Sequence, residues 1–264
     1  MQSKLNISRQ SDKIKSICAF IAAILIFIVC TKFLELDLGK FISRLSNAGN
    51  VLKRLAVVDF NRLSAIFSGM MVSVSIAIAA LVVGFVISIM LSFLSASNTA
   101  PNQTLAAIIK ATVAVVRAVP ALVWILMVVA STGFGSTGGM IGMTFPTVGY
   151  LTKSFIASIE EQGYNTIEAM RATGASWLNI ISKGLIPNLI TPFISWIAIR
   201  AEGNIAESIN LGMVGVAGIG SILMRAIGKY DYAGITTIIL VIFITMVIVE
   251  IIVNKIKKAI KYMA

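Results

Sequence analysis

The chain contains no histidine, only two cysteines and few charged residues. Charged side chains make up 12% of its 264 residues, whereas a soluble domain carries about 25%. Without histidine or clustered thiols, we expect no zinc or redox-metal site built by this chain. Cys18 and Cys30 lie in one apolar run, about 18 Å apart on a helix. They cannot form a disulfide within that helix, and they do not reveal the redox compartment.

The charged residues are missing in long blocks. No ionisable side chain occurs between Arg62 and Lys110, and the stretch from Ile235 to Val249 is equally bare. Apolar runs of about 20 residues match the thickness of a bilayer core. The net charge of +11 comes mainly from residues at the ends of these runs, where they contact lipid headgroups. The pattern indicates an integral membrane protein and argues against nucleic acid as a partner.

The apolar runs predict an all-α polytopic protein with about six transmembrane helices. We expect them near Ser16–Leu34, Gly69–Leu94, Leu105–Ser131, Gly139–Ile159, Leu189–Asn210 and Ala233–Val253. No small-x-small cleavage site follows the first run, so we interpret it as an uncleaved helix rather than a signal peptide. The third run contains Lys110, Arg117 and Pro120. We expect the two cations to contact headgroups or a neighbouring helix.

Basic residues at both ends of the chain set the expected orientation. Four Lys or Arg residues lie in the first 15 residues, and the tail from Lys255 is also basic. Six crossings then place both termini in the cytoplasm of a bacterial cell. The basic region 35–62 falls outside in this topology, and we expect it to form an amphipathic helix on the outer surface. Residues 1–60 form a first part, and residues 61–264 form the membrane domain.

The region of about 160–188, between the fourth and fifth segments, predicts two short helices joined by a bend. Asn165 can cap the first helix with Glu168 reaching back to it, and Gly174 can supply a left-handed terminator. Ser176 can cap the second helix, which we expect to run from Trp177 to about Leu185 and to end before Pro187. Such a segment can dock a soluble partner or act as a plain connector. A DNA-reading role is disfavoured because both ends are tied to membrane helices.

The residues "EAMRATGASWLNIISKGLIP" resemble the cytoplasmic EAA loop of binding-protein-dependent ABC importer permeases. Glu168, Ala169, Gly174 and Pro187 fall in register with that signature, whereas Met170, Gly184 and Ile186 depart from it. The resemblance implies a type I importer permease core of five helices plus one N-terminal helix. It also implies a loop that docks into a cytoplasmic ATPase through six residues. These are Glu168, Ala169, Arg171, Gly174, Ala175 and Pro187.

Two further stretches extend the resemblance over roughly residues 60–260. "VRAVPALVW" (116–124) is similar to the entry of the second core helix, and "RAEGNIAESINLGMVGVAGIG" (200–220) resembles phosphonate-type permeases. This implies a non-enzymatic subunit that carries a phosphonate, phosphite or phosphate and binds no cofactor. The implied partners are a second copy, two ATPase subunits that hold ATP and magnesium, an external binding protein and membrane lipid. An importer of methionine or another amino acid stays open.

One helix face and one glycine stretch are candidates for the pathway or its gate. Arg200, Asn204 and Glu207 share a face by their spacing, and ionisable groups in membrane segments normally face the interior or a water-filled path. A structural polar network is the alternative. The glycines lack the spacing of a dinucleotide fingerprint or a phosphate loop, and they serve either gating or close packing. They are Gly212, Gly215, Gly218 and Gly220.

Overall fold

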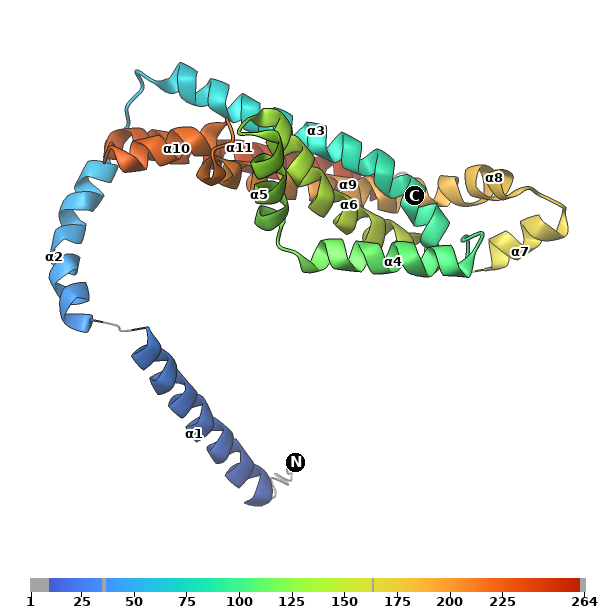
Figure 1. Ribbon diagram of the computed structural model, residues 1–264, viewed down its shortest axis with the longest axis horizontal. Helices are drawn as coiled ribbons and strands as arrows, with labels where there is room; N and C mark the ends of the chain where they lie inside the picture. The colour runs from blue at the N-terminus through green and yellow to red at the C-terminus, as the bar shows by residue number, and fades with distance from the viewer. Residues whose placement is uncertain (1–9, 35–36, 163, 262–264) are drawn as a thin grey trace, which may run out of the picture. The chain divides into compact units, whose positions relative to one another are not determined.

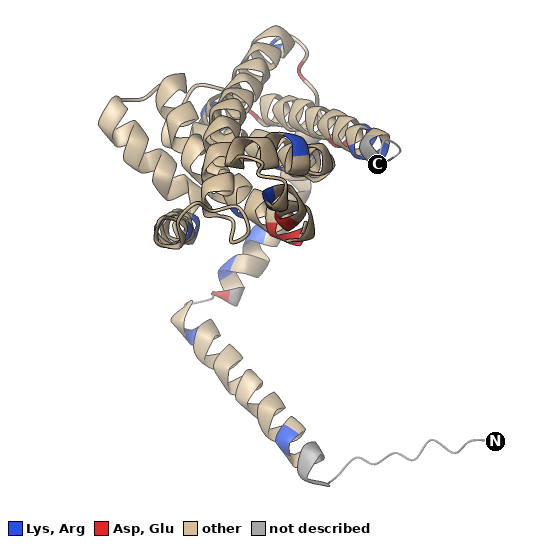
Figure 2. Ribbon diagram, turned by 90° about the vertical axis from the view of Figure 1, so that its right-hand side faces the viewer, with Lys and Arg blue, Asp and Glu red and all other residues tan. Residues whose placement is uncertain are grey.

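The computed structural model describes residues 10–34, 37–162 and 164–261, and these form helices and turns without a strand. The all-α prediction is confirmed. The chain divides into two compact units, Met1–Lys53 and Arg54–Ala264. Figure 2 shows how sparse charged residues are along the ribbon. This is typical of helices that lie against lipid or against one another.

The first unit holds α1 (Gln10–Phe33) and most of α2 (Leu38–Leu55). Within α1, Ile14–Phe33 is long and apolar enough to cross a membrane, close to the predicted bounds. The region of α2 was predicted as an amphipathic helix, and the helix is present. Its exposed apolar side chains include Phe41, Leu45 and Leu52, which suit contact with a bilayer surface. Its position on the outer side stays a prediction.

The second unit is a bundle of long helices joined by shorter ones (Figure 1). Its elements are α3 (Leu63–Ser95), α4 (Gln103–Ala118), α5 (Ala121–Thr132), α6 (Ser136–Glu161), α7 (Asn165–Ala172), α8 (Trp177–Asn179), a π-helix η1 (Ile180–Leu185), α9 (Ile186–Asn210), a 3₁₀-helix η2 (Leu211–Val214), α10 (Ile219–Gly228) and α11 (Tyr232–Lys261). In Figure 1, α7 and α8 project beyond one end of the bundle and α10 lies at the other end.

Four helical stretches of the described residues are long and apolar enough to span a membrane, and five if a bent pair counts as one. Two match the predicted segments at Gly69–Leu94 and Ala233–Val253, and the predicted Leu189–Asn210 lies within the longer stretch Trp177–Val214. The predicted Gly139–Ile159 is a helix, α6, but it is not among these stretches. Its glycines, threonines and charged residues near the end make it less apolar than α3 and α11.

The region predicted as the third segment, Leu105–Ser131, consists of two helices, α4 and α5, bent by 91° at a short break. Val119 is extended, with φ −86° and ψ 127°, and Pro120 precedes α5 as its cap residue. Proline has no N–H to donate and pushes the preceding residue out of the helical region. The chain therefore turns at Pro120.

Small residues bring α6 close to its neighbours. A Cβ built on Gly142 would lie 2.7 Å from the Cα of Ile125 on α5, and one on Gly149 would lie 2.8 Å from the Cγ of Arg117 on α4. Such close approaches are typical of helix packing in membranes. The glycines that interrupt this predicted segment therefore serve packing.

Candidate functional site

The bend at Gly174 has the backbone geometry that the sequence predicts. Gly174 has a φ of +77°, which a residue with a Cβ rarely adopts. Its N–H donates to the carbonyl of Arg171 at 2.9 Å, and the N–H of Ala175 donates to the carbonyl of Met170 at 3.1 Å. This pair of bonds is a Schellman motif. The glycine therefore ends α7 and redirects the chain.

The predicted cap at Asn165 is wrong. Asn165 is the first residue inside α7, and Tyr164 precedes it without a side-chain cap bond. The N–H of Glu168 donates to the backbone carbonyl of Tyr164 at 2.8 Å. A backbone hydrogen bond thus stands where the sequence predicted a side-chain capping box. The Glu168 side chain is exposed and has no ion pair within the described part of the chain. This carboxylate is free to meet a partner.

Four other residues implied for docking are at least partly accessible. Ala169 and Arg171 on α7 are exposed, Ala175 after the bend is half-buried, and Pro187 is exposed. Ile167, in contrast, is buried. One side of α7 thus packs inward while the other side is open.

The predicted end of the second helix at Pro187 is also wrong. Ser176 precedes α8 as expected, without a side-chain cap bond, but the helix then continues through η1 into α9. Pro187 stands in the first turn of α9, where its missing N–H costs little. The π-helical bond from Ile186 N–H to the carbonyl of Ile181 shifts the hydrogen-bond register just before the proline. The result is one helical stretch, Trp177–Val214.

The bent segment is packed against the membrane helices. Ile167 of α7 and Leu185 of η1 share an apolar cluster with Phe155 and Ile159 of α6. The indole Nε1–H of Trp177 donates to the backbone carbonyl of Thr99 at 2.8 Å, in the turn between α3 and α4. The segment is therefore anchored both to α6 and to the turn.

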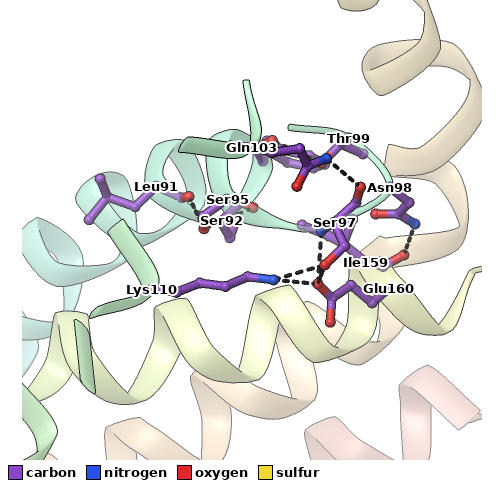
Figure 3. A network of polar contacts seen from close by, with 11 residues as sticks. Leu91, Ser92, Ser95, Ser97, Asn98, Thr99, Gln103, Lys110, Ile159 and Glu160 are labelled. Atoms are coloured by element: carbon purple, nitrogen blue, oxygen red, sulfur yellow. Dashed lines mark hydrogen bonds and ion pairs between the residues drawn. The ribbon is translucent and has the colours of Figure 1, made fainter. Parts of the chain in front are cut away.

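A polar network fixes the same turn to α6 and α4 (Figure 3). Glu160 Oε1 accepts from Ser97 N at 2.8 Å, from Ser97 Oγ at 2.7 Å and from Lys110 Nζ at 2.9 Å. Burial raises the pKa of Glu160, but the hydrogen bonds from Ser97 and Lys110 outweigh it and lower the pKa below its usual value. Lys110 thus contacts a neighbouring helix, one of the two predicted alternatives. A lysine within a predicted membrane segment signals that a partner is needed, but the sequence does not identify Glu160.

The predicted polar face on α9 is present: Arg200 and Glu207 form an ion pair, and Thr147 of α6 links Arg200 to Asn204. Arg200 Nη1 and Nη2 donate to the two carboxylate oxygens of Glu207 at 3.2 and 2.9 Å. Thr147 Oγ1 on α6 donates to Asn204 Oδ1 at 3.0 Å, and Asn204 Nδ2 donates to the carbonyl of Ala77 on α3 at 3.2 Å. Arg200 and Asn204 are buried. The face therefore ties α9 to α6 and α3, and the charge of Arg200 is paired.

The four candidate glycines lie in η2, in α10 and in the turn between them, and Figure 1 shows α10 at the opposite end of the bundle from α7 and α8. A Cβ on Gly212 would fall on the backbone of Gly220, and one on Gly220 would fall on the carbonyl oxygen of Ile209. Gly215 and Gly218 have φ values of +81° and +141°. These positions require glycine for close packing or for backbone conformation. Their role in a gate stays a prediction.

These features together define a multi-pass helical membrane protein with an exposed, bent segment at one end of its bundle. The fold is that of type I ABC importer permeases, since it matches a chain of an inward-facing MetNI methionine ABC transporter with a TM-score of 0.68. That match has 20% identity and covers 77% of this chain and 99% of the other. Residues 88–262 match the family described as "Binding-protein-dependent transport system inner membrane component". The chain belongs to this family.

The chain is similar to several permeases that are named for phosphite or phosphate transport. The phosphite transport system permease protein PtxC of Stutzerimonas stutzeri is 30% identical over 178 residues, which cover 67% of this chain and 65% of that protein. The phosphate-import permease protein PhnE of Mycolicibacterium smegmatis is 27% identical, with 76% of this chain and 38% of that protein covered. The methionine import permease MetP of Bacillus subtilis is 25% identical over 168 residues. The matches thus span less than two thirds of the length of the first two relatives.

Proposed function

We propose that this chain is the permease subunit of an ATP-driven importer for a small oxyanion. Two copies form the pathway, two cytoplasmic ATPase subunits bind ATP and magnesium, and an external binding protein delivers the solute. The family membership and the fold support this assembly. The basic N-terminal and C-terminal ends support an orientation with both termini and the bent segment in the cytoplasm.

The observation that carries the proposal is the continuous helical stretch Trp177–Val214. One end is joined to the bent segment, where Glu168 is exposed and unpaired, and the other end carries Arg200 and Glu207. A helix transmits displacement along its axis because its backbone bonds form a rigid ladder. When closing ATPase subunits move α7, the polar face on α9 moves with it. This is alternating access driven from one end of a helix.

The oxyanion substrate is favoured over an amino acid. Relatives named for phosphite and phosphate transport align over 67% and 76% of this chain at 30% and 27% identity. The methionine permease MetP aligns over 60% of the chain at 25%. The second candidate, methionine, keeps the support of this relative and of the MetNI fold. Uptake of labelled phosphite, methylphosphonate and methionine by cells that express the complete transporter separates the two candidates.

The docking role is tested by substitutions at the bend. Gly174→Val places a β-branched residue at positive φ, at a cost of about 1–2 kcal/mol, and misdirects the chain after the bend. We expect this variant to reach the membrane but to co-purify with little ATPase. Gly174→Asn is the matched control, since asparagine tolerates the left-handed conformation, and it should retain the ATPase.

Glu168 tests the contact itself. We expect Glu168→Ala to weaken ATPase co-purification and solute uptake, because it removes an unpaired exposed carboxylate. Glu161→Ala, which changes an exposed carboxylate at the end of α6, before α7 and the bend, should leave both unchanged. Normal ATPase binding and normal uptake in both Glu168→Ala and Gly174→Val would make the segment a plain connector.

A further inference from the structure

A cavity of about 320 Å³ lies between α4 and α6. Three cationic side chains line it, Lys110 and Arg117 from α4 and Lys153 from α6, together with the carboxylate of Glu160 and apolar side chains such as Ile156. Lys110 and Arg117 are seven residues apart, about 10 Å along the helix. The cavity therefore runs from the network at the α3–α4 turn toward the bend at Pro120.

Two of the three cations of this cavity, Arg117 and Lys153, have no ion pair among the residues that the structure describes. Glu160 is already bonded to Lys110 Nζ at 2.9 Å and to Ser97. In the described residues, neither Arg117 nor Lys153 has a carboxylate within ion-pair distance or a side-chain hydrogen bond. Arg117 and Lys153 are both exposed, so two positive charges without an ion pair among the described residues line one open cavity.

The path of Arg117 across α6 is fixed by packing. Its Cγ lies where only glycine fits, since a Cβ built on Gly149 would come within 2.8 Å of it. Gly149 thereby makes room for the arginine stem to lie across α6 toward the cavity. Arg200 on α9 offers no comparable site, because Glu207 occupies both of its terminal nitrogens.

We propose that this cavity binds a phosphate-type oxyanion through Arg117 and Lys153. A guanidinium donates two parallel hydrogen bonds to a tetrahedral oxyanion, and a lysine adds a mobile point charge. The volume equals that of about ten water molecules at about 30 Å³ each, enough for a phosphate group with part of its hydration shell. Lys110, held by Glu160, forms the rim of the cavity.

Two sources offer this chemistry. One is the headgroup of an anionic phospholipid, since basic pockets between membrane helices bind such headgroups. The other is the transported solute itself, and this alternative rests on the proposed function. The binding assay below uses the purified full-length chain without ATPase, so a failure of coupling does not affect its outcome.

The test measures the binding of two kinds of anion, a lipid headgroup and a soluble oxyanion, to wild type and variants. Native mass spectrometry of the delipidated chain records phosphatidylglycerol against phosphatidylcholine, and calorimetry records inorganic phosphate and methylphosphonate. We expect Arg117→Gln and Lys153→Gln each to weaken binding about tenfold, equivalent to about 1.4 kcal/mol. Lys255→Gln, which removes an exposed lysine on α11, should bind as wild type does. Selective loss of the lipid assigns the headgroup, and selective loss of phosphate or methylphosphonate assigns the solute.

A second measurement needs no variant. Saturating phosphatidylglycerol or phosphate should slow acylation of Lys153 in the wild-type chain relative to Lys255, because a bound anion covers the amine. The proposal is overturned if wild type binds neither anion. It is equally overturned if both glutamine variants bind as wild type does, or if neither ligand protects Lys153.

Discussion

The ion pair between Arg200 and Glu207 allows a prediction of how much one contact stabilises the bundle. The Arg200 side chain is 9% exposed and that of Glu207 is 31% exposed. Removing one partner of a fully buried pair costs about 3–5 kcal/mol, because the other charge is left without compensation. Water reaches the Glu207 side, so we expect Glu207→Gln to cost about 1–3 kcal/mol.

A double-mutant cycle isolates the pair. Arg200→Met leaves the more exposed partner alone and should cost less than Glu207→Gln. The double variant Arg200→Met/Glu207→Gln should be more stable than the sum of the single effects predicts, with a coupling energy of about 1–2 kcal/mol. The assay is thermal unfolding of the purified full-length chain in detergent, followed by tryptophan fluorescence. A loss of 2 kcal/mol corresponds to a shift of about 4–8 °C in a protein of this size.

The control is Glu202→Gln on the same helix, since Glu202 has no ion pair within the described residues. It should unfold at the temperature of wild type. Additive single effects, or a wild-type unfolding temperature for Glu207→Gln, would refute the reasoning that Glu207 compensates a buried guanidinium. If the variants are destabilised but transport normally per folded molecule, the face is structural rather than a gate.

Three other predictions follow from single contacts. Gly220→Ala should destabilise the fold by about 1–3 kcal/mol or more, because its Cβ meets a backbone carbonyl. Gly203→Ala, whose nearest contact is at 3.9 Å, should be tolerated in the same unfolding assay. Trp177→Phe removes the bond to the turn carbonyl and should cost about 1 kcal/mol, whereas an unchanged unfolding temperature would show that this bond contributes nothing. Because its folded pKa is lowered, Glu160 stabilises the fold above its usual pKa of about 4.5. The stability difference between wild type and Glu160→Gln should therefore shrink as the pH falls below that value.

Local chemistry made part of the bent segment predictable. Gly174 is the residue type that ends a helix in the left-handed conformation, and the structure has it there. Pro187 misled the prediction, because proline forbids a helix interior but suits a first turn. Which of the two applies depends on the π-helical turn before it, and that turn is packed through Ile180 and Leu185 against α6. Tertiary packing of this kind is not visible in a single sequence.

Contacts within one helix were predictable, and contacts between helices were not. Arg200 and Glu207 are seven residues apart, so helical periodicity alone places them on one face. Lys110 and Glu160 are fifty residues apart on different helices, and only the fold brings them to 2.9 Å. The bend at Pro120 lies between these cases, since the proline signals a break but not its angle of 91°.

The paired and unpaired cations of this domain lie on different helices. Arg200 is neutralised by Glu207 on the helical stretch that continues from the bent segment, so motion of that helix carries no net charge through the bundle. Arg117 and Lys153 lie on α4 and α6, outside that stretch, and have no ion pair among the described residues. The two groups are nevertheless joined, because Thr147 bonds to Asn204 on α9 at 3.0 Å and stands on the same helix as Lys153. Under the proposed coupling, a displacement that begins at the bend would reach the basic cavity through α6.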